Sequence, residues 1–162
     1  MATRNCCRYR LVYLAGAMEN TTDNGINWRV AYRDDLQDIL DIHAIIPGIG
    51  ENLVKPINID MQEIKVTNPT LFEEVERRFI ALDIALIDIS DFVIVRYEGE
   101  AISGTTAEVH HCYMTGKPVY MVTSLPFEQL PGWMASEIGV ENIFQTLSCL
   151  IGHLGEKIYN NV

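Results

Sequence analysis

The sequence predicts an α/β fold built on a parallel sheet. Short apolar runs typical of strands alternate along the chain with stretches of helical periodicity, and this alternation is typical of βαβ units. The chain has 162 residues, 48% of them hydrophobic, which is enough for one core and short for two. We therefore expect a single domain over residues 1–162.

Five segments are candidate strands. They lie at residues 9–15, 43–47, 92–97, 119–123 and, with the weakest signal, 142–144. The run at 92–97 is mostly apolar and is predicted to be buried.

Helical periodicity fills most of the intervals. Residues 26–40 follow a candidate cap at Asn24 and carry an apolar stripe predicted to face the core: Trp28, Tyr32, Leu36 and Ile39. Asn68-Pro69 is a strong helix start, and one apolar face follows it: Phe72, Val75, Phe79, Leu82 and Leu86. Residues 107–114 and 146–159 are also predicted helices, the latter interrupted by Gly152 and Gly155, whereas 126–138 is ambiguous.

The charge and composition of the chain argue against some classes of binding partner. The net charge of -10 and the lack of a Lys/Arg run argue against nucleic acid or an anionic membrane, so a small molecule is the expected ligand. Residues 1–10 lack the apolar core of a signal peptide, and no segment has eighteen uninterrupted apolar residues, so we expect a cytoplasmic protein.

Cysteine and histidine do not predict a metal site. The four cysteines, at positions 6, 7, 112 and 149, have neither C-x-x-C spacing nor the density of a disulfide scaffold, so reduced thiols are expected. In His110-His111-Cys112, neighbouring side chains on a helix diverge by about 100°. Cys112 is more simply a buried thiol than a nucleophile.

The segment Ser103-Gly104-Thr105-Thr106-Ala107-Glu108 is the most informative motif, because it lies between a predicted strand and a predicted helix. With the helix starting near Ala107, Glu108 falls in the first turn, where unpaired N–H groups and the helix dipole favour an ionised carboxylate that can act as a nucleophile. The alternative is a capping box, Thr105-x-x-Glu108, in which the glutamate only returns a hydrogen bond to the cap residue.

Ligands of parallel sheets bind beyond the carboxyl ends of the strands, where the strand order reverses. Three segments should meet there: the turn at 15–18, the loop at 47–52 and the segment 98–108. The stretch 47–67 is long for a connection and is predicted to be a loop that covers the site. Gly48-Ile49-Gly50 lacks the third glycine of a dinucleotide fingerprint, so no such cofactor is expected.

Four motifs occur together in one order: Tyr13-Leu14-Ala15-Gly16; Asp83 before Ser90-Asp91-Phe92-Val93-Ile94; Gly104-Thr105-Thr106-Ala107-Glu108; and Gly116-Lys117-Pro118-Val119. The combination resembles the nucleoside 2-deoxyribosyltransferases and their N-glycoside hydrolase relatives. The resemblance implies a flavodoxin-like, doubly wound sheet of about five strands with helices on both faces. It also implies nucleoside salvage chemistry without metal or organic cofactor, in a homo-oligomer that completes its sites across subunits.

The resemblance implies three catalytic roles. Glu108 matches the nucleophile that attacks C1′ of the deoxyribose, and Asp83 matches the acidic residue that faces the base. Tyr13 matches the tyrosine that orients the nucleophile. Judged without the resemblance, Asp83 is a solvated residue near a helix C-terminus, a poor place for an anion, and Tyr13 is a core residue.

Candidate substrate contacts follow the three converging segments. They are Gly16, Ala17, Met18, Glu51, Ser103, Gly104 and Thr105. Glu51 falls where relatives place a base-reading amide, but it equally suits a solvated loop charge. Trp28 is either a wall of the base pocket or part of the core stripe of its helix.

Two departures from the family pattern bear on the substrate. Ile102 stands six residues before Glu108, where transferases carry an aspartate that binds sugar hydroxyls and where 5′-monophosphate hydrolases carry a serine. No counterpart of the asparagine that a neighbouring subunit contributes is evident near residues 133–136. The leading hypothesis is a 2-deoxyribosyltransferase acting on a nucleoside and a free nucleobase; the alternatives are a 5′-monophosphate N-glycoside hydrolase and a non-catalytic nucleotide-binding or sensing module.

Overall fold

A five-stranded, all-parallel sheet forms the centre of the protein in a computed structural model, which describes residues 10–18, 23, 25–47, 59–100 and 102–159. The strands are β1 (Arg10–Gly16), β2 (Ile42–Ile45), β3 (Phe92–Arg96), β4 (Val119–Val122) and β5 (Ile143–Phe144). Their order, β2-β1-β3-β4-β5, is that of flavodoxin-like folds. The predicted fold class is therefore confirmed, and all five predicted strands are present, with each end within two residues of the prediction.

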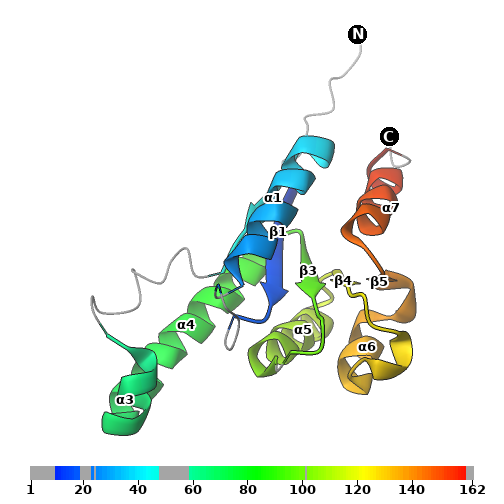
Figure 1. The fold of residues 1–162 in the computed structure, drawn as a ribbon. Coiled ribbons are helices and arrows are strands. Elements are labelled where there is room, and N and C mark those ends of the chain that lie inside the picture. The colour runs from blue at the N-terminus through cyan, green and yellow to red at the C-terminus, as the bar shows by residue number, and fades with distance from the viewer. Residues whose placement is uncertain (1–9, 19–22, 24, 48–58, 101, 160–162) are drawn as a thin grey trace.

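Helices cover both faces of the sheet (Figure 1). α1 (Ile26–Leu40) and α7 (Leu147–Tyr159) pack on one face, where the core includes Leu14, Leu36 and Leu150. α4 (Pro69–Ile89), α5 (Ser103–Thr115) and α6 (Gly132–Ile138) pack on the other, around a core that includes Tyr13 and Val109. Two short 3₁₀ turns, at Phe127–Gln129 and Val140–Asn142, flank α6, so the ambiguous stretch at 126–138 holds a turn and a short helix.

The helix start at Asn68-Pro69 is confirmed. The Asn68 side chain accepts a hydrogen bond from the backbone N–H of Leu71, and Pro69 occupies the first turn, where its missing N–H costs nothing. The prediction that 47–67 is all loop is wrong at its C-terminal end, because α3 (Met61–Thr67) forms there. Asp60 caps α3 by accepting from the N–H groups of Gln62 and Glu63, a local signal strong enough to start a helix.

Two expectations for the first and last helices are wrong: Ile39 does not lie in the core, and α7 is not interrupted at its glycines. Gly25, in a left-handed conformation, precedes α1, and Asp23 accepts from the N–H groups of Gly25 and Asn27; the predicted cap, Asn24, lies outside the described residues. Ile39, expected in the core, is 56% exposed. α7 runs without a break through both of its glycines, because its apolar face packs on the sheet and outweighs their low helix propensity.

The strand order reverses between β1 and β3. β1 continues through α1 to β2 on one side, and β3 pairs with β1 on the other, with Gly16 opposite Arg96 where the two strands end. Figure 1 shows both arrows pointing to the same end of the molecule, the end at which α5 begins. A ligand site is expected at this switch point. No helix among the described residues is long and apolar enough to cross a membrane.

Candidate active site

Glu108 lies in the second turn of α5, not in the first as the sequence predicted. The helix begins at Ser103, four residues earlier than expected, and its N-cap residue Ile102 makes no side-chain capping bond. Thr105 is buried inside the first turn and is not a cap residue, so the capping-box alternative for Glu108 is wrong. The carboxylate is free to act outside its own helix.

A tyrosine of the central sheet holds the Glu108 carboxylate. The Tyr13 hydroxyl donates to Glu108 Oε1 at 2.7 Å, joining residues 95 positions apart. Tyr13 is fully buried in β1, and its ring belongs to the core between the sheet and the helices α4 to α6. Tyr13 therefore fills the core and also orients Glu108, so the two interpretations of this residue hold together.

Burial, more than any helix dipole, decides the protonation of Glu108. Desolvation raises the pKa of this carboxyl to about 7, with a further rise from the negative charge of Asp83. The Tyr13 hydrogen bond and the positive charge of Arg29 act the other way and lower the pKa. The expectation of a permanently ionised glutamate is thus wrong: near neutral pH the carboxyl titrates, which is common among catalytic groups.

Burial and the charge of Glu108 also raise the pKa values of Tyr13 and Cys112. The pKa of the Tyr13 hydroxyl is raised, first by burial and then by the charges of Glu108 and Asp83, so the hydroxyl remains a donor. Burial and the nearby Glu108 raise the pKa of the Cys112 thiol to about 11. Cys112 is a free, buried thiol and not an activated nucleophile.

Asp83 belongs to the same group of charges. It is half-buried on α4 and interacts electrostatically with both Tyr13 and Glu108. α4 continues to Ile89, so Asp83 precedes the last turn and does not face the negative end of the helix dipole, contrary to expectation. The structure brings together the three residues assigned catalytic roles, from β1, α4 and α5.

The turn after β1 is built around Trp28 and Arg29. A Cβ on Gly16 would lie 2.9 Å from Trp28 Cζ2 and 2.9 Å from the Arg96 carbonyl oxygen, so glycine is required there for packing. Trp28 is half-buried against the core of α1 and stacks edge-on with Tyr32, which supports the core interpretation of this residue.

Arg29 was not identified from the sequence. It is 1% exposed and donates to backbone carbonyls at the end of β1. One signal could have found it, because Arg29 precedes Leu36 by seven residues and so lies on the buried face of α1.

The remaining predicted contacts fall in three places. Ser103 and Gly104 are exposed at the start of α5, Thr105 is buried beneath them, and Gly104 has open space where a side chain would be. Ala17 is buried, and Met18 is half-buried, at the end of β1. Glu51 lies outside the described residues, so its two interpretations stay open.

The two histidines of α5 each contact a carboxylate on a different helix. His110 Nδ1 lies 2.6 Å from Glu137 Oε1, and His111 Nε2 lies 2.8 Å from Asp88 Oδ1. The pairs point apart, as adjacent helical residues do. Within the described parts of the chain no three His, Cys, Asp or Glu side chains converge on a point that a metal ion could occupy.

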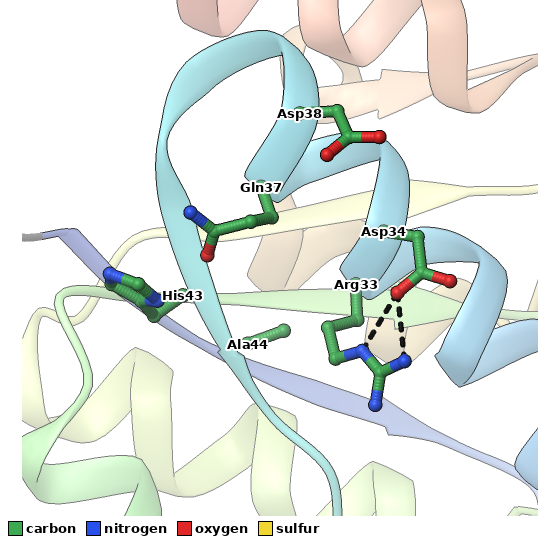
Figure 2. A pocket seen from close by; sticks show the side chains of 6 residues that line it. All are labelled: Arg33, Asp34, Gln37, Asp38, His43 and Ala44. Atoms are coloured by element: carbon green, nitrogen blue, oxygen red, sulfur yellow. Dashed lines mark hydrogen bonds and ion pairs between the residues drawn. The ribbon is translucent and has the colours of Figure 1, made fainter.

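A surface hollow of about 360 Å³ lies elsewhere, between α1 and the edge strand β2 (Figure 2). Its lining residues are Arg33, Asp34, Gln37, Asp38, His43 and Ala44. None of them is a predicted site residue, and Arg33 is paired with Asp34 at 2.8 Å.

The protein thus has a flavodoxin-like α/β fold, and its half-buried Glu108 accepts a hydrogen bond from Tyr13. The sequence matches no family model and none of the curated proteins. Among solved structures, the chain is similar to a 2-deoxyribosyltransferase from the psychrotolerant bacterium Bacillus psychrosaccharolyticus, described as a biocatalyst for the synthesis of nucleosides. The two share 17% identity with a TM-score of 0.63, over 87% of this chain and 90% of the other. At this identity the similarity establishes the fold.

Proposed function

We propose that the protein is an enzyme that exchanges the base of 2′-deoxyribonucleosides through a covalent glycosyl-glutamate intermediate on Glu108. The observation that carries the proposal is the hydrogen bond of 2.7 Å from Tyr13 to Glu108, which holds a half-buried carboxylate beside β1, one of the two strands between which the strand order reverses. The fold shared with a 2-deoxyribosyltransferase and the sequence motifs around Tyr13, Asp83 and Glu108 support it.

The first half-reaction breaks the bond between the sugar and the base. Oε2 of ionised Glu108 attacks C1′ while Tyr13 holds Oε1, and the C1′–N bond breaks with its electron pair passing to the base nitrogen. Asp83, in its protonated form, gives a proton to the leaving base. In the second half-reaction a nitrogen of the incoming base attacks C1′ and displaces Glu108, and Asp83 takes up the proton that this nitrogen loses, so two inversions retain the configuration and the cycle closes.

The burial of Glu108 favours this chemistry. A pKa of about 7 means that its negative charge is poorly solvated in the folded protein. Attack on C1′ converts the charged carboxylate into a neutral ester, which relieves the cost of burying the charge. Because only protein with ionised Glu108 can attack C1′, the acid limb of the kcat/KM profile should lie near pH 7.

Substrate contacts are assigned to the ends of β1 and β3. We place the sugar and base against Gly16, Ala17 and Met18 on one side and against Ser103 and Gly104 on the other. Two further assignments, Thr105 and Glu51, complete the contact set. Because Ala17 and Thr105 are buried, their contribution is by backbone groups.

Ile102 distinguishes this site from the family pattern. Its side chain packs against the core and offers no polar group to the sugar. The 5′ end of the sugar is therefore left to Ser103 or to groups outside the described residues, and a nucleoside 5′-monophosphate hydrolase is the alternative activity.

The proposed active form is a homo-oligomer, at least a dimer. Large exposed apolar side chains on α5 and α6 support this, with Tyr113 at 58%, Met114 at 69% and Trp133 at 71% exposure. Light scattering on the purified protein tests it, and a fully active monomer would contradict it.

The deciding experiment incubates purified protein with a deoxynucleoside and a different free base, and follows the products by chromatography. Parallel reactions contain the deoxynucleoside alone and deoxynucleoside 5′-monophosphates alone. Base exchange that is lost in Glu108→Gln and kept in Glu156→Gln, an exposed glutamate of α7, is the expected result. Free base released only from the monophosphates would identify the hydrolase. Ligand binding by thermal shift, without any product and unaffected by Glu108→Ala, would instead identify a sensing module.

A further inference from the structure

Arg29 is a buried cation whose hydrogen bonds all go to the backbone. Its Nε donates to the Leu14 carbonyl at 3.0 Å, Nη2 to the Gly16 carbonyl at 2.9 Å, and Nη1 to the Gly25 carbonyl at 2.8 Å, with the Ala17 carbonyl at 3.5 Å from Nη1. Arg29 is 1% exposed, and its Cζ lies 4.4 Å from the centre of the Trp28 ring. One side chain thus joins the last part of β1 to the residue that precedes α1.

This arrangement requires the shape of arginine. The acceptors lie around the edge of one planar fork, which the compact ammonium of lysine cannot match. Gly25 makes the room for it: a Cβ there would lie 2.4 Å from Arg29 Nη1 and 2.3 Å from the Ala17 carbonyl oxygen, and its φ of 67° also favours glycine. The turn after β1 is therefore built to hold this guanidinium.

The charge of Arg29 is not used in an ion pair with any described carboxylate, since the salt bridges within the described residues involve other cations. A buried charge without such a partner is costly, by several kcal/mol. What faces it is a set of anions and polar groups at longer range: Asp23, Tyr13, Glu108 and Asp83. Two half-buried carboxylates and one cation are thus coupled around the same end of β1.

We infer that Arg29 is a positioning residue of this site, whose fork fixes the carboxyl end of β1 and whose charge interacts with the carboxylates of Glu108 and Asp83. The inference rests on the proposed function for its kinetic consequence, but its electrostatic part does not. The backbone clamp acts on Leu14, the residue that follows Tyr13, and on the predicted substrate contacts Gly16 and Ala17.

Groups on three elements around α5 shift the pKa of the Glu108 carboxyl. β1 gives the Tyr13 hydroxyl, α4 gives Asp83, α1 gives Arg29, and α5 itself gives the Cys112 thiol, which couples to Glu108. Of these groups only Arg29 carries a positive charge. Loss of that charge raises the pKa of Glu108 above its value of about 7, because Asp83 and burial then act against the hydrogen bond of Tyr13 alone.

The test compares Arg29→Met and Arg29→Lys with a matched control, Arg33→Met, one turn further along α1 at an exposed position. The Glu108 carboxyl is titrated by ¹³C NMR, assigned by its absence in Glu108→Gln, and kcat/KM for base exchange is measured over pH. We expect the midpoint of Glu108 to rise in Arg29→Met and to stay near the wild-type value in Arg29→Lys. We expect kcat/KM to fall roughly tenfold or more in both, since the fork is lost in both. Arg33→Met should change neither the titration midpoint of Glu108 nor kcat/KM.

An unchanged Glu108 midpoint in folded Arg29→Met would overturn the inference and leave Arg29 as a purely structural residue. If that variant does not fold, Arg29→Lys decides: wild-type kcat/KM in it would show that the fork is not needed. A wild-type protein that lacks turnover would refute the proposed function, yet the NMR titration of Arg29→Met would still support or refute the positioning role.

Discussion

Glu108→Gln should stabilise the protein against unfolding at alkaline pH and have much less stabilising effect at acidic pH. The pKa of Glu108 is about 7 in the folded chain and 4.5 for an ordinary glutamate. A group whose pKa is raised by folding contributes stability that is fully present below the unfolded pKa and is lost as the pH rises through the folded one. For Glu108 that window runs from 4.5 to about 7.

The magnitude follows from the two pKa values. Each unit of difference is worth about 1.4 kcal/mol, so ionising this carboxyl costs the folded state about 3 kcal/mol in all. Between about pH 5.5 and about pH 8, about 2 kcal/mol of that cost appears. Glutamine keeps the shape of the protonated acid and does not titrate, so the stability of the variant relative to wild type should rise by that amount over the same interval.

Urea unfolding followed by circular dichroism, at several pH values, measures the difference directly. Taking variant minus wild type at each pH cancels the titration of every group that is not coupled to Glu108. Glu156→Gln, exposed on α7, controls for the loss of one surface charge. A Glu108→Gln difference that stays flat with pH, or falls as the pH rises, would refute the claim that burial dominates the protonation of Glu108.

Three further variants test the neighbours of Glu108 and the turn after β1. Tyr13→Phe removes a hydrogen bond that favours the carboxylate, so the acid limb of the kcat/KM profile should move to higher pH, with kcat roughly tenfold lower. Asp83→Asn removes a charge that raises the same pKa, so the acid limb of the kcat/KM profile should move to lower pH while kcat falls about a hundredfold. If the acid limb moves in the same direction in Tyr13→Phe and in Asp83→Asn, the charge assignment is wrong. Gly25→Ala should destabilise the protein by about 2 kcal/mol or more by urea unfolding, because its Cβ meets Arg29 and the Ala17 carbonyl, whereas Gly104→Ala, with open space around it, serves as the tolerated comparison.

The sequence alone determined most elements of this fold and three of the residues that meet beside β1. Alternating apolar runs located five strands, and Asn68-Pro69 marked a helix start, because strand hydrophobicity and helix caps are local properties of a few residues. The motifs around Tyr13, Asp83 and Glu108 selected three side chains that the structure brings together from three elements.

Only the tertiary structure decided the surroundings of those side chains. The local pattern placed Glu108 in a first turn, ionised by the helix dipole, but α5 starts at Ser103 and burial leaves the carboxyl titrating near neutral pH. The Tyr13 hydroxyl reaches Glu108 across 95 positions of sequence, and Arg29 is buried because the turn after β1 surrounds it with carbonyls. A pKa depends on desolvation and on charges from other elements, and neither is present until the sheet and its helices have packed.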